Sequence, residues 1–161
     1  ETPAPEADAT LTALWGEDYA DYPARTFRGG LTGDGQADFS LTLPTEMTAE
    51  FSHNAWVIRP SEGDAFLELS FIAGTDGETL LPGLLDAYLD FREIEFDTVP
   101  ALGTLRGEIG CVRASGDDTV AEGWLADISG GVLSAVLVCP KERQAFEGNL
   151  LLAVLNTLTL L

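Results

Sequence analysis

The spacing of apolar side chains along the chain predicts three helices. Over residues 11–22 large apolar residues recur every three or four positions, which predicts an amphipathic helix that ends at Pro23. The same period predicts a helix over residues 79–91. A last helix is expected to begin after Pro140 and to present a broad apolar face as far as Leu158.

Elsewhere apolar and polar residues alternate, which is typical of strands with one face in water. The expected strands lie at residues 37–43, 50–58, 65–73, 94–99, 104–114, 119–127 and 132–139. The last of them is apolar on both faces, which predicts cover on both sides. Three strands, a helix, about four strands and a helix together predict an α+β fold, an antiparallel β-sheet with packed helices.

The composition predicts a short tether followed by one domain. Residues 1–10 hold two prolines, three acids and no large apolar side chain, which is typical of a flexible acidic tether. Residues 11–161 then form a single α+β domain. The tether favours an exported protein, secreted or held at the cell surface by an upstream lipid anchor, and a trimmed cytosolic chain is the alternative. No apolar run approaches the roughly 20 residues of a membrane span.

The charge narrows the classes of partner. The chain has 27 Asp and Glu against eight Lys and Arg, giving a formal net charge of -19 at pH 7. A field of that sign repels phosphate backbones, which excludes nucleic acid as a partner. It is compatible with cationic partners, although acidity also simply confers solubility.

Three segments carry a family resemblance. They are FSLTLPTEM at residues 39–47, AYLDF at 87–91, and the closing hairpin and helix at 123–160. Together they resemble the PsbP-like α/β/α sandwich family, and in particular its exported bacterial lipoproteins. The family also includes photosystem PsbP proteins and a Ran-binding nuclear import factor. Its usual Trp after the Leu-Pro pair is absent here, and Met47 stands near that place. The resemblance implies a mostly non-enzymatic protein that works by binding partners.

Motifs of catalysis are missing. His53 is the only histidine, and we expect it to be a half-buried structural residue of its strand. No G-x-S-x-G elbow is present to supply a nucleophile. One histidine and two cysteines 28 residues apart do not match a structural zinc site. The single lysine, Lys141, follows Pro140 and not a glycine-rich loop, which excludes a P-loop. We therefore predict no catalytic, cofactor-binding or metal-ligating residues.

Two acidic loops offer oxygen atoms that calcium could use. Asp34, Gly35 and Asp38 lie in one of them, and Asp117 and Asp118 in the other. Neither has the spacing or the terminal glutamate of an EF-hand. We therefore expect ordinary acidic turns, no tightly bound zinc and no obligatory calcium.

Glu93, Glu95 and Asp97 alternate with apolar residues, which places three carboxylates on one side of an extended segment. They are either a patch for a cationic partner or the solvated edge of a sheet that resists aggregation, and we favour the edge.

The aromatic residues Trp15, Tyr19 and Tyr22 also allow two interpretations. They could anchor a partner, because aromatic residues dominate interface hot spots. We favour docking of their segment on the domain itself.

The cysteines test the expected strand register. If Gly116-Asp117 and Gly130-Gly131 are two-residue turns, Cys111 and Cys139 both lie opposite Glu122 on the same face. Their Cα atoms would then be roughly 10 Å apart, beyond the roughly 7 Å that a disulfide can normally bridge. The register therefore predicts two free, buried thiols, whereas export and an even cysteine count favour a disulfide.

Three hypotheses of function stay open. The first is a non-catalytic extracytoplasmic binding or interaction domain for an unknown protein or small molecule of cationic character. The second is a glycosidase-like hydrolase that uses only carboxylates, which predicts two facing acids in a deep, partly apolar pocket. The third is a structural module of a cell-surface assembly, which predicts an exposed apolar patch.

Overall fold

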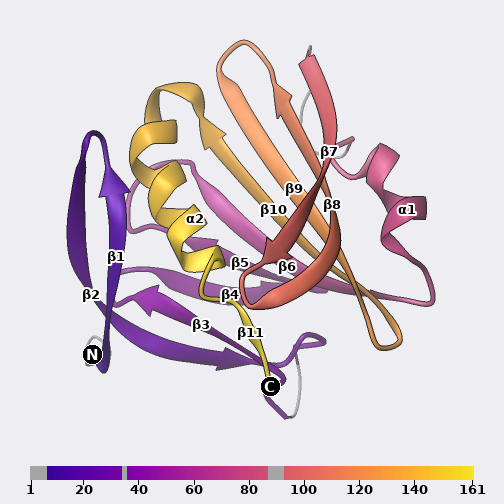
Figure 1. Ribbon diagram of the computed structural model, residues 1–161. Helices are drawn as coiled ribbons and strands as arrows, with labels where there is room; N and C mark the ends of the chain where they lie inside the picture. Colours follow the sequence, from indigo (N-terminus) through magenta and orange to yellow (C-terminus); the bar gives the residue numbers. More distant parts are fainter. Residues whose placement is uncertain (1–6, 34–35, 87–92) are drawn as a thin grey trace.

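The computed structural model describes residues 7–33, 36–86 and 93–161, which form two antiparallel sheets (Figure 1). The smaller sheet contains, in spatial order, β1 (Ala9–Trp15), β2 (Asp18–Gly29), β3 (Phe39–Pro44) and β11 (Thr159–Leu160). The larger sheet contains β4 (Thr48–Ser52), β5 (Ala55–Arg59), β6 (Phe66–Ala73), β10 (Gly131–Pro140), β9 (Thr119–Ile128), β8 (Leu105–Ser115) and β7 (Glu93–Leu102).

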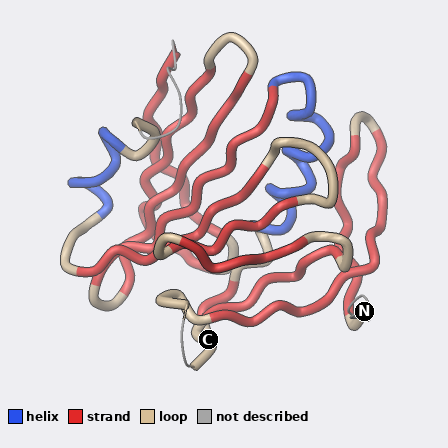
Figure 2. The backbone as a smooth tube through the Cα atoms, turned by 180° about the vertical axis from the view of Figure 1, so that it is seen from behind, coloured by secondary structure: helices blue, strands red, loops and turns tan. Residues whose placement is uncertain are grey.

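Two short helical segments pack on the larger sheet. The first is α1 (Gly77–Leu80), which continues into a 3-10 turn at Leu81–Gly83. The second is α2 (Asn149–Leu155), which follows a 3-10 turn at Lys141–Arg143 and a π turn at Gln144–Gly148. Figures 1 and 2 show them on opposite sides of the sheet. The protein is therefore mostly β, with antiparallel sheets that carry helical segments.

Each face of the larger sheet has its own apolar cluster, because side chains alternate along every strand. The main core lies on the α2 side and includes Leu67, Leu69, Leu133, Ala135, Leu151 and Leu155, together with residues of the smaller sheet. The second cluster lies on the α1 side and includes Leu81, Leu84, Leu85, Val112 and Val136. The Leu84 side chain packs directly over Gly123, and a Cβ atom at position 123 would lie 2.5 Å from it and force it to shift. The predicted cover on both faces of β10 is thus confirmed.

The predicted helix over residues 11–22 is wrong, since this segment is the β1–β2 hairpin. Leu11 and Ala13 are buried on alternate positions of β1, which is the period of a strand. Gly16, with φ of 69°, supplies the left-handed backbone of the tight turn. Its N–H donates to the Ala145 carbonyl at 2.8 Å and so fixes the hairpin to the π turn. Pro23 lies within β2 instead of ending a helix.

The aromatic residues of this hairpin behave in two ways. The Trp15 ring packs edge-on against Phe146 at a centroid distance of 5.4 Å and also contacts Tyr22. Tyr19, by contrast, keeps 76% of its surface exposed. The segment therefore docks on the domain, as predicted, but as a hairpin.

The helix predicted over residues 79–91 is shorter where it is described. Regular helix covers only Gly77–Leu80, and its N-cap is Asp76, whose carboxylate accepts a hydrogen bond from the Thr79 N–H at 2.8 Å. The 3-10 turn at Leu81–Gly83 follows, with proline in its first turn. The rest of the predicted helix, residues 87–91, lies outside the described residues.

The strand predicted over residues 50–58 is in fact two strands. His53 and Asn54, with φ of 55° and 65°, form the two-residue turn between β4 and β5. The other predicted strands are found within a few residues of their expected ends. Residues 9 and 10 of the expected tether belong to β1, which begins at Ala9, and residues 1–6 lie outside the described part of the chain.

The last predicted helix begins later than expected. Pro140 ends β10, and regular α-helix runs only over Asn149–Leu155, after the 3-10 and π turns. Of the helices in the described ranges, none combines the length and the apolar character that crossing a membrane requires.

Candidate functional site

Strand register arranges the side chains of the α2 side of the larger sheet in straight rows. One row runs across β10, β9, β8 and β7 through Leu137, Glu122, Arg113 and Glu95. The next row runs through Cys139, Val120, Ser115 and Glu93, and a third through Ala135, Trp124, Cys111 and Asp97. Each row begins with a small or apolar side chain at β10, the strand that the π turn contacts, and ends with a carboxylate on β7.

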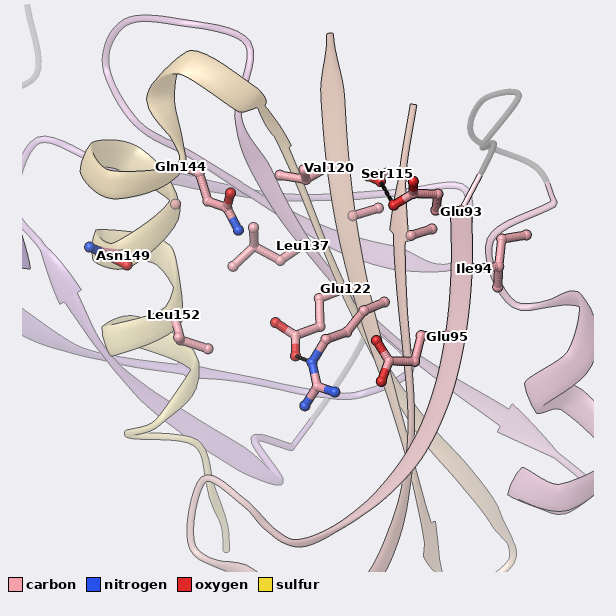
Figure 3. A pocket seen from close by; sticks show the side chains of 14 residues that line it. Glu93, Ile94, Glu95, Ser115, Val120, Glu122, Leu137, Gln144, Asn149 and Leu152 are labelled. Atoms are coloured by element: carbon pink, nitrogen blue, oxygen red, sulfur yellow. Dashed lines mark hydrogen bonds and ion pairs between the residues drawn. The ribbon is translucent and has the colours of Figure 1, made fainter. Parts of the chain in front are cut away.

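The whole first row, with Val120, Ser115 and Glu93 of the second, forms the floor and one wall of a cavity of about 290 Å³, which we call the α2 cleft. The third row lies outside its lining. The π turn and α2 supply the facing wall (Figure 3). The residues that line the cleft include Glu93, Glu95, Arg113, Val120, Glu122, Leu137, Gln144, Asn149 and Leu152. The cleft therefore combines an apolar floor under the helix with an acidic rim at the edge of the sheet.

The helical wall has an irregular backbone. The π turn at Gln144–Gly148 places Gln144 at the mouth of the cleft, and α2 adds Asn149 and Leu152 below it (Figure 3). The Asn149 side chain donates to the Ala145 carbonyl at 3.0 Å, which holds its amide near the wall. Single π turns are rare in helices and occur frequently at functional sites.

Arg113 connects the charged side chains on the sheet side of the cleft. Its Nε donates to the Glu122 carboxylate at 3.0 Å, and its Nη1 lies 3.4 Å from the Asp97 carboxylate. The Glu93 carboxylate accepts a hydrogen bond from the Ser115 hydroxyl at 3.5 Å. The cleft is lined by the carboxylates of Glu93, Glu95 and Glu122 and by one guanidinium, so its electrostatic potential is negative.

The two cysteines lie on the α2 side of the sheet and both are fully buried and free, as predicted. Their predicted positions opposite Glu122 are wrong, since Cys111 pairs with Trp124 and Cys139 with Val120. Each hairpin differs from the expected register by two residues, which preserves the face. The cysteines are then four residues apart along β9 and two strands apart across it, or about 16 Å.

Burial also makes both thiols poor nucleophiles. Burial, as the larger cause, and the Glu122 carboxylate, as the second, raise the pKa of Cys111 to about 12. Burial and the Glu147 carboxylate raise the pKa of Cys139 to about 11. Both side chains are therefore neutral thiols near pH 7 and fill space as small apolar groups.

The structure places His53 differently from the prediction. It is an exposed turn residue between β4 and β5 and not a half-buried strand residue, and its Nδ1 lies 3.4 Å from the Ser52 hydroxyl. His53 lines a second hollow of about 420 Å³ together with Phe51 and Glu68. Lys141 is exposed at the start of the last helical segment and lines neither cavity.

The acidic loops do not converge on an ion site in the described residues. The Asp38 carboxylate accepts the Leu31 N–H at 2.6 Å and so closes its own loop. Asp34 and Gly35 lie outside the described residues. Within residues 7–33, 36–86 and 93–161 no group of three or more His, Cys, Asp or Glu side chains is arranged to hold a metal ion.

The sequence identified only the acidic wall of the cleft. Glu93, Glu95 and Asp97 do share one face of β7, as expected, and they lie exposed on the edge strand of the sheet. Glu93 and Glu95 also line the cleft. The residues that sequence reasoning missed are Arg113, Glu122, Leu137 and Leu152. For the first three, strand parity was a usable signal, because it already placed Glu122 on the face of the cysteines.

Comparison with known proteins supports the fold alone. No protein-family model and no curated protein matches the sequence. The structure is similar to the solution structure of cyanobacterial PsbP (CyanoP) from Synechocystis sp. PCC 6803, with a TM-score of 0.57 and 12% sequence identity. The similarity covers 86% of this chain and 92% of that chain. The chain therefore has a PsbP-like fold.

Proposed function

We propose that this protein is a non-catalytic, extracytoplasmic binding domain and that the α2 cleft is its binding site. The observation that carries the proposal is the gradient within the cleft. Val120, Leu137 and Leu152 provide apolar surface, and the rim beside them carries Glu93 and Glu95. A ligand with a positive charge next to an apolar group would satisfy both ends at once.

The proposed location outside the cytoplasm rests on sequence. The acidic, proline-containing segment at residues 1–10 supports export, with the protein secreted or tethered at the cell surface. The segments that resemble exported PsbP-like lipoproteins support the finer assignment to the α/β/α sandwich and to that branch.

The hydrolase alternative is less compatible with the cleft. A glycosidase needs one carboxylic acid that gives up a proton and a second carboxylate across from it. Glu122 instead accepts a hydrogen bond from the Arg113 guanidinium at 3.0 Å, so its carboxylate is already engaged within the protein. Hydrolysis of a compound from a broad substrate panel that is abolished by Glu122→Gln would overturn the non-catalytic assignment.

The binding site is tested by a substitution that places a positively charged side chain in the cleft. Leu152→Arg introduces a guanidinium on the helical wall of the cavity that the acidic rim also lines, and should abolish capture of the ligand from native cell-envelope extracts. Leu161→Arg is the matched control, because Leu161 is 63% exposed and lines neither cavity. Equal capture by both variants would contradict the assignment of the site.

A further inference from the structure

The β7 strand forms one end of the larger sheet and pairs with β8 on a single side. In the described part of the chain no strand pairs with its other side. The Thr98 N–H donates to the side chain of Asp97 at 2.7 Å, so it is not donating to β8. In an antiparallel sheet the N–H and C=O of alternate residues face the same neighbour, so those of Phe96 and Ile94 face outward as well.

The two faces of this free edge have different chemistry. Glu93, Glu95 and Asp97 project on the cleft side. Ile94 and Phe96 project on the opposite side, where 51% and 52% of their surfaces are exposed. Natural edges are usually protected by charge, proline or irregular backbone. Here the carboxylates supply charge on one face of β7, and Ile94 and Phe96 leave its other face apolar. Proline and a register shift occur only at the far end, around Pro100.

The negative charge of β7 determines which kind of partner strand can pair with this edge. A second copy paired antiparallel through β7 would bring carboxylates of the two copies opposite one another, and like charges across a strand pair are destabilising. The net charge of -19 adds repulsion between whole molecules. A strand in which basic residues alternate with apolar residues meets the carboxylates on one face and Ile94 and Phe96 on the other.

We propose that the partner is an extended peptide segment of alternating basic and apolar residues, which adds to the larger sheet as a strand beside β7. Main-chain hydrogen bonds to Ile94 and Phe96 supply affinity, and the carboxylates supply the selection for lysine or arginine. The proposal deepens the proposed function and rests on it, since the basic side chains of the added strand turn toward the acidic rim of the α2 cleft.

The test uses the whole protein and a short, end-capped, fluorescent peptide of alternating lysine and valine, kept monomeric. Its binding is followed by fluorescence anisotropy at low ionic strength. A peptide of alternating glutamate and valine should bind at least about tenfold more weakly. A lysine–valine peptide with N-methyl groups on the amides of one edge should also bind at least about tenfold more weakly, because it keeps its charge but cannot pair.

Two variants of one residue separate backbone pairing from side-chain contact. Phe96→Pro removes an outward N–H, which edge strands tolerate, and should weaken binding by at least about tenfold. Phe96→Val keeps that N–H and should change binding by less than about threefold. Thermal melts of both variants check that the fold is retained. The N-methylated peptide gives the same information with the unaltered protein if Phe96→Pro does not fold.

Three other results would change the assignment of the partner or of the site. Equal binding of the N-methylated and parent peptides would overturn the proposal in favour of unspecific charge attraction. A dimer of the wild-type protein that Phe96→Pro dissociates would show that a second copy occupies the edge. Peptide pairing at β7 together with unchanged native-ligand capture by Leu152→Arg would support the edge and contradict the cleft.

Discussion

The strands β10 and β7 belong to the same sheet and have the same length, ten residues, yet they have opposite surroundings. β10 (GVLSAVLVCP) has no charged residue and is buried at every position but its two ends. β7 (EIEFDTVPAL) has three carboxylates, and its first six residues are exposed. β10 receives cover from the main core on one face and from the α1 cluster on the other. β7 receives a partner on one edge only.

This contrast separates two roles of one sheet. A strand contributes most to the free energy of unfolding when side chains cover both its faces and strands pair with both its edges, because buried apolar area is the main stabilising quantity. The edge contributes little to it and is free to carry charge and unpaired backbone groups. Substitutions in the centre should therefore change stability, and substitutions at the edge should change binding.

The largest expected effect comes from truncating one side chain in each strand. Leu133 in β10 is completely buried, so Leu133→Ala should lower the free energy of unfolding by about 3 kcal/mol. Phe96→Ala in β7 should lower it by less than about 1 kcal/mol, because half of that side chain is already in water. Urea unfolding followed by tryptophan fluorescence measures both. Similar losses would remove the distinction between centre and edge.

Alkaline pH should weaken the buried centre through its thiols. The unfolded Cys111 thiol ionises near pH 9, whereas burial and Glu122 raise the pKa of the folded thiol to about 12. The unfolded state alone therefore releases this proton as the pH rises from 9 toward 12, so stability is complete below pH 9 and is lost through that window. By pH 10 the loss is about 1 kcal/mol for this thiol.

Cys111→Ala isolates that contribution. The variant should lose about 1 kcal/mol less than the wild type between pH 8 and pH 10, and the two should behave alike between pH 6 and pH 8. The measurement is urea unfolding at a series of pH values. Parallel stability curves throughout would show that Cys111 already ionises in the folded protein.

The ion pairs of the cleft should matter for binding and little for stability. The side chains of Arg113 and Asp97 are 43% and 53% exposed, so solvent screens their attraction. Arg113→Gln should change the free energy of unfolding by less than about 1 kcal/mol. Because it leaves the carboxylates without their cation, it should strengthen binding of the lysine–valine peptide about threefold. Weaker binding would place Arg113 among the contacts of the ligand.

The smallest expected effect is that of salt on the free protein. A chain with a net charge of -19 repels itself, and sodium chloride at about 0.1 M screens charges beyond about 10 Å. The melting temperature should rise slightly over that range. The same salt should weaken binding of the lysine–valine peptide, so a fall in melting temperature or tighter peptide binding would each contradict the electrostatic description.

The sequence was sufficient to predict strands whose hydrophobic pattern is local. It was misleading where the same residues fit both the period of a helix and the period of a strand. In β8, β9 and β10 short runs of strand-forming residues between glycine turns locate the strands to within a few residues. In the first hairpin, Trp15, Tyr19 and Tyr22 fall at helical spacing by coincidence. The strand assignment there depends on tertiary contacts, such as that between Trp15 and Phe146, which no local pattern contains.

The candidate site was predictable only in part for a related reason. That Glu93 and Glu95 share a face follows from the period of a strand. Their alignment with Arg113 and Glu122 depends on register, and both turns of the meander differ from the expected ones. The connection from β9 to β10 turns at residues 129 and 130 instead of 130 and 131. The facing wall depends on how α2 packs across the sheet, which Leu152 alone does not reveal.

The most direct test of the account is a titration of the isotope-labelled protein with the lysine–valine peptide, followed by backbone amide NMR shifts. We expect the largest shifts at Ile94 and Phe96, smaller shifts along the α2 cleft at Glu122 and Asn149, and almost none at Val136 of β10, which lies on the α1 side. Shifts spread over all acidic surface segments, including the turn at Asp118, would show charge attraction without a site. That result would contradict the assignment of recognition to the edge of the sheet.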